Sequence, residues 1–190
     1  IYKNENGNWT PVGSEINGDE NDRWLGRTVS LSGDGSTVGI GAQSSQRNKI
    51  YQNINNKWTQ DFVGGESGSS GATSLSSDGS TFAIGDDNGG EVFRNGKVSI
   101  YRNLLGGWTQ IGSSIEAEGE EEHLLGHSIQ LSADGSVIAV GIPYNNSNSK
   151  TTAGIVRVYQ YKNNEWNKIG SDIKGKYDPD EFGMDVSLSN

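Results

Sequence analysis

The stretch Val29-Ser-Leu-Ser-Gly-Asp-Gly-Ser-Thr-Val-Gly-Ile-Gly41 is the unit from which the fold can be predicted. It recurs at 74–85 and 130–141, and a fourth copy begins at 186–189. On both sides of a central Asp-Gly, apolar residues alternate with small or polar ones, which is the two-residue period of a β-strand. Asp-Gly favours a hairpin turn because Asp bonds nearby backbone N–H groups and Gly accepts a positive φ. Each complete copy therefore predicts a strand, a tight turn and a second strand.

A second repeated unit alternates with the first. An Ile-Tyr or Val-Tyr pair is followed by Trp, and Tyr and Trp are seven residues apart in all four copies, at Trp9, Trp58, Trp108 and Trp166. The intervening residues are turn formers such as Asn and Gly, which predicts another hairpin. Successive Trp residues are 49, 50 and 58 positions apart, and such periods are typical of propeller blades and solenoids. We expect these Trp and Tyr side chains to form the core between neighbouring repeats.

Together the two hairpins make a four-stranded antiparallel repeat. The sequence therefore predicts an all-β fold, a β-propeller built of four-stranded blades, in which small residues stand where neighbouring blades approach closely, at Gly39, Ala83 and Ala139. We interpret 1–190 as a single propeller segment with about three complete blades, 24–63, 70–115 and 124–173, and two partial ones, 1–16 and 182–190. This count predicts either a segment of a longer array or self-association that completes the partial blades.

The composition excludes several classes of protein. Among 190 residues there are 24 Asp and Glu against 15 Lys and Arg, so we expect no nucleic-acid partner, because phosphate binding needs a basic surface. The chain contains no Cys, which removes disulfides, thiolate metal sites and Cys nucleophiles. No run approaches the roughly 18 apolar residues of a membrane helix, so we expect no membrane insertion. A hydrophobic share of 31 % with 28 Gly suits short strands joined by tight turns.

A dipeptide that precedes the first strand in three copies of the repeat carries a family resemblance. It is Leu25-Gly26, Leu125-Gly126 and Phe182-Gly183, and with the Asp-Gly turns it resembles the FG-GAP propeller repeat of integrin α chains. The Ser-x-Asp-Gly turns are also similar to those of WD40-like repeats. The resemblance implies a propeller fold. Calcium-binding versions carry several carboxylates in the turn, whereas each turn here has one, so we expect no metal there and no cofactor.

The antiparallel order of the strands predicts that all the variable loops lie at one face of the propeller. These loops hold 17 of the 24 acidic residues, and loops on a rigid scaffold commonly carry binding groups. An acidic face would attract a protein partner with a cationic surface. The candidate residues for this face are Asp19, Glu20, Asp22, Asp86, Asp87, Glu120, Glu121, Glu122, Asp178, Asp180 and Glu181.

No catalytic constellation can be assembled from the repeat, so we expect a non-enzymatic scaffold, interaction or adhesion module. A lectin-like or cation-dependent binder and a propeller-fold enzyme remain as alternatives. Two glycosylation sequons begin at Asn145 and Asn8, and both fit a secreted, extracellular or lumenal protein.

Overall fold

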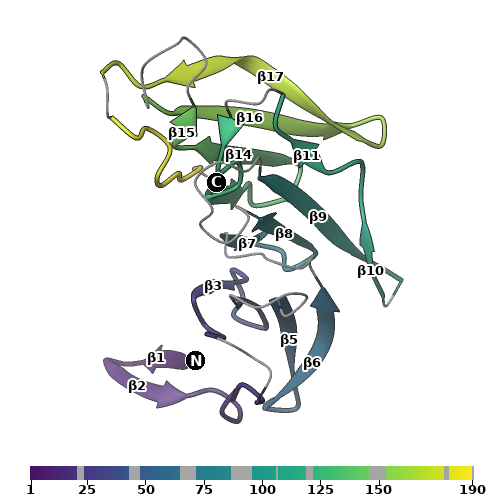
Figure 1. Ribbon diagram of the computed structural model, residues 1–190. Coiled ribbons are helices and arrows are strands. Elements are labelled where there is room, and N and C mark those ends of the chain that lie inside the picture. Colours follow the sequence, from purple (N-terminus) through teal and green to yellow (C-terminus); the bar gives the residue numbers. More distant parts are fainter. Residues whose placement is uncertain are drawn as a thin grey trace.

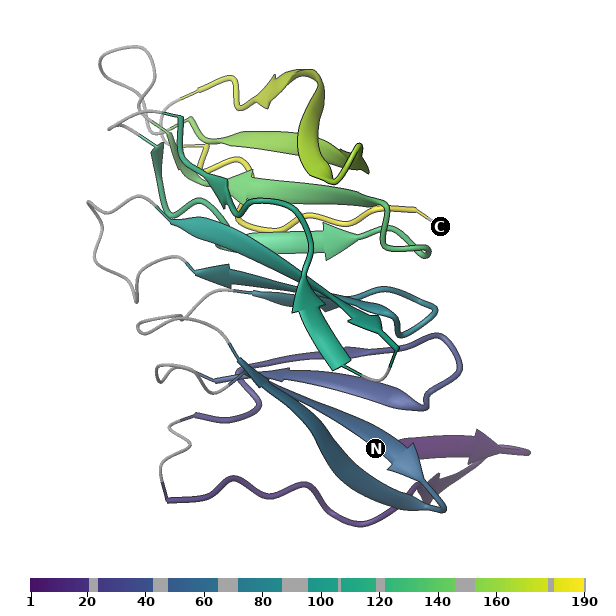
Figure 2. The ribbon, with the colours of Figure 1, turned by 90° about the vertical axis from the view of Figure 1, so that its right-hand side faces the viewer.

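The computed structural model describes residues 1–20, 24–42, 48–64, 72–86, 96–105, 107–118, 122–145, 153–177 and 180–189, and every regular element in these ranges is a β-strand (Figure 1). Three antiparallel sheets follow one another along the chain and lie side by side (Figure 2). Within the described ranges, no helix is long and apolar enough to cross a membrane. The all-β prediction with four-stranded repeats is confirmed.

Each sheet keeps the chain order of its strands. The first sheet contains β3 (Thr28–Leu31), β4 (Thr37–Gly41), β5 (Asn48–Ile54) and β6 (Lys57–Gly64). The second contains β7 (Thr73–Leu75), β8 (Thr81–Asp86), β9 (Lys97–Leu104) and β10 (Gly107–Gln110), and β11 (Ile115–Glu116) also pairs with β9. The third contains β13 (Ser128–Leu131), β14 (Val137–Ile142), β16 (Ile155–Lys162) and β17 (Glu165–Lys174).

Two short strand pairs accompany these sheets. β1 (Tyr2–Glu5) and β2 (Asn8–Pro11) form an N-terminal hairpin, while β12 (Glu122–His123) pairs with β15 (Tyr144–Asn145). At the other end of the chain, Phe182 makes an isolated bridge with Gly154, and Gly183 accepts a hydrogen bond of 2.7 Å from Ser128 Oγ. The fourth copy of the repeat therefore begins against the third sheet.

The Asp-Gly turns form by local hydrogen bonding. Ser32 Oγ donates to Asp34 at 2.7 Å, and the same carboxylate accepts the Ser36 N–H at 2.9 Å. Gly35 takes a φ of 73°, which a residue with a side chain rarely adopts. Equivalent bonds and a positive-φ Gly recur in the second and third turns. The local sequence thus determines the turn between the first two strands of each sheet.

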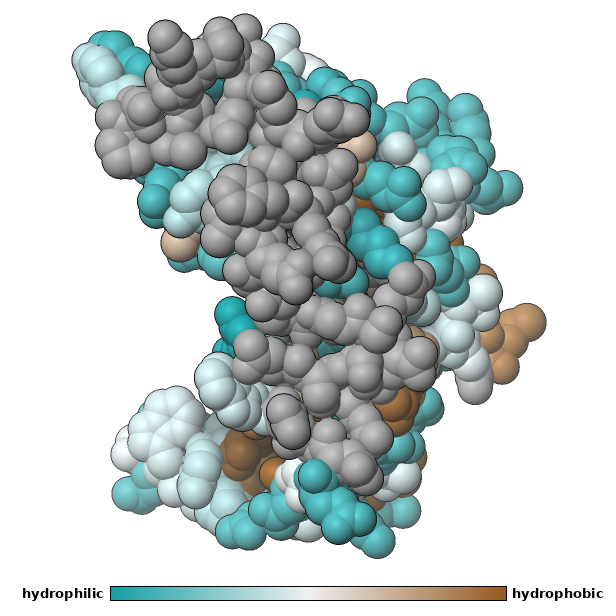
Figure 3. Space-filling view, viewed as in Figure 1, coloured by the Kyte–Doolittle hydropathy of each residue, from teal (hydrophilic) through white to brown (hydrophobic). Residues whose placement is uncertain are grey.

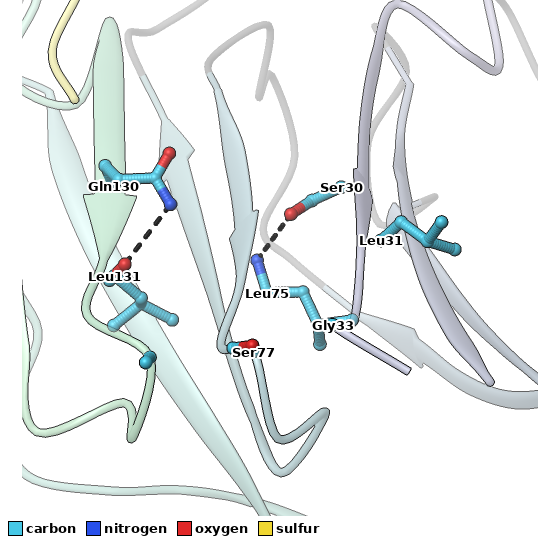
Figure 4. Close-up of a pocket in the computed structure, with 8 residues that line it drawn as sticks. Ser30, Leu31, Gly33, Leu75, Ser77, Gln130 and Leu131 are labelled. Atoms are coloured by element: carbon cyan, nitrogen blue, oxygen red, sulfur yellow. Dashed lines mark hydrogen bonds between the residues drawn. The ribbon is translucent and has the colours of Figure 1, made fainter. Parts of the chain in front are cut away.

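Serine hydroxyls join the first strands of neighbouring sheets. Ser30 Oγ accepts the backbone N–H of Leu75 at 2.8 Å, and Ser74 Oγ accepts that of Leu131 at 2.9 Å. Figure 4 shows Ser30 directed from β3 toward Leu75 on β7. The first strands β3, β7 and β13 are thereby held in a row.

The prediction that small residues stand at close approaches is confirmed for Gly39. A Cβ added to Gly39 would lie 2.9 Å from Cδ2 of Phe82, a fully buried ring of the next sheet. Ile50 of the first sheet shares a core cluster with Leu75 and Phe82 of the second. The hydrophobic core therefore lies between sheets, as inter-blade packing requires.

The prediction that the Trp side chains belong to this core is confirmed for three of the four repeats. Trp58 is buried, Trp108 and Trp166 are half-buried, and each indole N–H bonds a group of the preceding repeat, at Val12 O, Asp61 Oδ2 and Ile111 O respectively. The prediction is wrong for Trp9 and for Tyr2, which are 67 % and 65 % exposed. Among the described residues, the hairpin that carries Trp9 has no preceding sheet to cover it.

Candidate functional site

The connections between sheets, and those between the second and third strands within each sheet, lie at one edge of the molecule, here named the loop edge. The Asp-Gly turns lie at the opposite edge, on the right of Figure 2. The described residues of the loop edge are 13–20, 42, 48–49, 86, 96–97, 112–118, 142–145, 172–177 and 180–181. Because neighbouring strands are antiparallel, every second-to-third and fourth-to-first connection returns to this edge.

Two of the predicted candidates make contacts across the loop edge. The Asp19 carboxylate lies 3.7 Å from Lys49 Nζ, and Glu181 accepts a 3.2 Å hydrogen bond from the Tyr144 hydroxyl. Burial, together with the neighbouring Glu181 charge, raises the pKa of Tyr144. Both candidates therefore form part of the structure of the edge as well as of its surface.

The other described candidates differ in their exposure. Glu20 is exposed, Asp86 is buried at the end of β8, and Asp180 accepts two backbone N–H bonds of 2.7 Å from the segment before it. For Glu122 the backbone alone is described, in β12. The remaining candidates lie outside the described residues: Asp22, Asp87, Glu120, Glu121 and Asp178.

The two sequon residues also have different environments. Asn8 is exposed at the start of β2, while Asn145 ends β15 and only its backbone is described.

In the first and the third sheet, a buried cation on the third strand is paired with an acid of the preceding repeat. The Lys49 side chain is 6 % exposed and pairs with Asp19, ten residues after Trp9. The Arg157 side chain is 4 % exposed and lies 3.5 Å from Glu118, ten residues after Trp108. The two pairs are therefore the same contact in two copies of the repeat. A buried cation needs such a partner because desolvation of an unpaired charge is costly.

The second of these contacts is extended into a network. Asp172 accepts bonds of 3.1 and 3.2 Å from Arg157, and Lys168 Nζ lies 3.1 Å from the same carboxylate. The hydrogen bond from Arg157, followed by the hydrogen bond from Lys168, keeps the pKa of Asp172 below its usual range. Sequence reasoning missed Lys49 and Arg157, although the Trp-plus-ten spacing of their partners is a signal that could have found them.

The carboxylates of the opposite edge are held inside their turns. Hydrogen bonds from Ser132 and Ser136 lower the pKa of Asp134 to about 2, and the equivalent bond from Ser32 lowers that of Asp34. Within the described ranges, no group of three or more His, Cys, Asp or Glu side chains is placed to hold a metal ion. The aspartates of these turns therefore maintain the turn geometry.

A shallow groove of about 260 Å³ runs across the first strands of the three sheets (Figure 4). Two of its polar side chains are already engaged: Ser30 accepts the Leu75 N–H, and Gln130 donates to the Leu131 carbonyl at 3.2 Å. Its lining contains neutral residues only: Ser30, Leu31, Gly33, Leu75, Ser77, Gln130, Leu131 and Ala133. Such a lining can offer hydrogen bonds but supplies no general acid or base.

Comparisons with known proteins identify the architecture. No family model matches the chain, and no curated protein matches its sequence. Among solved structures, a 6-phosphogluconolactonase-like protein from Bacteroides uniformis aligns with a TM-score of 0.57 and 11 % identity, over 94 % of this chain and 49 % of the other. A eukaryotic initiation factor aligns with a TM-score of 0.54 and 11 % identity, over 91 % and 36 %. Sqt1 of Saccharomyces cerevisiae aligns with a TM-score of 0.53 and 16 % identity, over 88 % of this chain and 40 % of Sqt1.

At these identities the likeness shows the fold alone. The neighbours are β-propellers, including WD40 types, so the predicted propeller fold is confirmed. The likeness to FG-GAP repeats in particular stays a prediction. The chain spans between 36 % and 49 % of the length of these three structures.

Proposed function

We propose that this chain is a non-enzymatic interaction module that presents its acidic loop edge to a protein partner with a cationic surface. The observation that carries the proposal is the concentration of acids at the loop edge, whose loops contain 17 of the 24 Asp and Glu residues. Among the described ones, Glu20 and Glu116 are exposed, whereas Asp34 and Asp134 of the turn edge are bound within their turns. A concentration of negative charge on one face accelerates encounter with cationic surfaces.

An adhesive role outside the cytoplasm is the finer form of this proposal. The resemblance to FG-GAP repeats supports it, and so does the backbone geometry that recurs at the dipeptides Leu25-Gly26, Leu125-Gly126 and Phe182-Gly183. The residue before each dipeptide has a positive φ, 58° at Trp24, 61° at Leu124 and 46° at Glu181, and each dipeptide Gly follows with φ near 90°. A sequon at Asn145, on the loop edge, is consistent with a secreted or lumenal protein.

The proposal is tested with a defined cationic probe. A synthetic oligolysine peptide should bind the chain at low salt, and Glu20→Gln with Glu116→Gln should weaken that binding several-fold, because two exposed charges are lost from one edge. The matched control is Glu5→Gln with Glu165→Gln, which removes two exposed charges from the opposite edge. Isothermal titration calorimetry measures both. Equal weakening by the two double variants would exclude the loop edge as the binding surface.

A second measurement tests the absence of catalysis. Activity-based probes and hydrolase substrate panels should report no turnover that depends on this chain. Reproducible turnover that is lost on heat unfolding would overturn the non-enzymatic assignment.

A further inference from the structure

One apolar face of the first sheet is uncovered, although the equivalent faces of the other two sheets are covered. Leu31 is 45 % exposed, whereas Leu75 and Leu131, which occupy the same position in the repeat, are 4 % and 2 % exposed. Val29, two residues earlier on β3, is 61 % exposed, and Ile129 at its position is 5 % exposed. The side chains are similar, so the difference lies in what packs against them.

At the two covered faces, the neighbour is the preceding sheet, and its first hairpin makes part of the contact. Leu75 lies on β7, which contacts both β3 and β4, and its N–H donates to Ser30 Oγ on β3. Leu75 also packs in one cluster with Ile50 on β5. Leu131 lies in one cluster with Ala83 of the preceding sheet, and its N–H donates to Ser74 Oγ. The covering hairpin therefore presents a serine directly before the Leu that ends its first strand, Ser30 or Ser74, and a small residue in its second strand, Gly39 or Ala83.

At the uncovered face, the side chains of β3 already have the required directions. Figure 4 shows Ser30 pointing toward Leu75 and Leu31 pointing away from it, to the opposite side of β3. Successive residues of a strand alternate between its two faces, so this arrangement repeats that of β7 and β13. Leu31 is thus directed toward the position that a preceding hairpin would occupy.

A strand edge lies beside this face. Among the described residues, β1 pairs with β2 alone, whereas the equivalent strands β5 and β9 also pair with the second strand of their own sheets. The register there is Gly39 opposite Ile50 and Ala83 opposite Ile100. By the repeat, Ile1 is the equivalent of Ile50 and Ile100. An unpaired strand edge binds an added strand through its backbone N–H and C=O groups.

The outline of the molecule agrees with these contacts. Figure 3 shows the surface hollowed between the N-terminal hairpin and the upper part of the molecule, with hydrophobic residues among hydrophilic ones near the hairpin. Tyr2 and Trp9 of that hairpin are 65 % and 67 % exposed. Exposed aromatic and aliphatic side chains around a concave surface are typical of an interaction site.

We propose that the edge of β1 and the exposed face of β3 together bind a β-hairpin equivalent to the first two strands of this repeat, as in β7 and β8. The first strand of that hairpin packs on Val29 and Leu31, and its serine, at the position of Ser30 and Ser74, accepts the N–H of Leu31. Its second strand pairs with β1 in antiparallel register. The hairpin 72–86 of this chain has the required serine and small residue, Ser74 and Ala83, and it already covers the equivalent face of the third sheet.

The binding test uses a synthetic peptide with the sequence of 72–86 and the whole chain. The peptide should bind saturably, and its Ser74→Ala form should bind about fivefold more weakly, which corresponds to one net hydrogen bond. In the chain, Leu31→Lys should abolish binding, because it places a charge on the apolar face. Leu31 is largely exposed, so this variant should fold. Leu105→Lys changes another exposed Leu, on the β9–β10 hairpin, and should bind normally.

The register is tested by disulfide trapping, since the chain contains no Cys. The repeat places peptide residue Phe82 opposite Tyr2, so cysteines at these two positions should form a disulfide, whereas cysteines at Phe82 and Glu5 should not. The absence of saturable binding at millimolar peptide would overturn the proposal, and so would equal trapping of both cysteine pairs. A chain that dimerises through this face and takes up no peptide would also overturn it.

Discussion

The contact between Gly39 and Phe82 tests directly how neighbouring sheets pack. Phe82 is fully buried, and a Cβ on Gly39 would come within 2.9 Å of its ring. Because the ring lies in a filled core, Gly39→Ala should lower the free energy of unfolding by about 2 kcal/mol, within the usual range for overpacking. Phe82→Ile alone should lower it by about 1–2 kcal/mol, because it leaves a cavity.

The interface between the second and third sheets suggests which combination relieves the overlap. Ala83 of the second sheet and Ile138 of the third occupy the equivalents of Gly39 and Phe82, and they share one core cluster. The double variant Gly39→Ala with Phe82→Ile should therefore lie within about 1 kcal/mol of the parent, which implies a coupling energy of about 2 kcal/mol. Urea unfolding followed by Trp fluorescence, with a constant m-value, measures all four proteins. A double variant whose loss equals the sum of the two single losses would refute the reasoning.

Three further predictions concern hydrogen bonds and ion pairs of the repeat. Asp172→Asn should lower the free energy of unfolding by about 1–3 kcal/mol, because the buried Arg157 loses a carboxylate at 3.1 Å while Glu118 remains. Ser30→Ala should lower it by about 1–2 kcal/mol and speed amide hydrogen exchange at Leu75, whose N–H loses its acceptor. Asp134 has its pKa lowered from 3.8 to about 2, so its stabilising effect is complete above 3.8 and is lost as the pH falls through 2. Asp134→Asn should therefore flatten the loss of stability between about pH 4 and pH 2.

Matched controls separate these effects from a general loss of a polar group. Asp185→Asn removes an exposed carboxylate and should change the free energy of unfolding by less than about 0.5 kcal/mol, without altering the slope below pH 4. Ser171→Ala, at an exposed position, should leave amide exchange at Leu75 unchanged. If a control matches its test variant, the contact concerned does not stabilise the fold as argued.

The strand order of each sheet could be predicted because the turns are decided by residues close in sequence. Ser32 and Asp34 form hydrogen bonds within their turn to partners at most five residues away, so the same residues give the same hairpin in every copy. The close approach of the next sheet at Gly39 could also be predicted, since a glycine inside a strand indicates that another part of the chain packs closely against it. Local chemistry repeated at a fixed period carried the prediction.

Contacts between repeats were harder to read. Trp9 and Trp58 look alike in sequence, yet Trp9 is exposed and Trp58 is 6 % exposed, because burial depends on the sheet that lies beyond each one. Lys49 resembles a solvent-facing residue of an alternating strand, although it is buried against Asp19. The two-residue period tells which residues share a face but not what packs against that face.

The ion pairs between sheets divide the acids of the loop edge into two kinds, and salt distinguishes them. Pairs such as Lys49 with Asp19 involve a buried cation and are screened weakly, whereas exposed acids such as Glu20 are screened strongly. Raising the salt concentration should therefore weaken oligolysine binding steeply while changing the free energy of unfolding little. Parallel losses of binding and stability would mean that the same acids serve both roles, and the loop edge could not then release its partner without loosening the sheets.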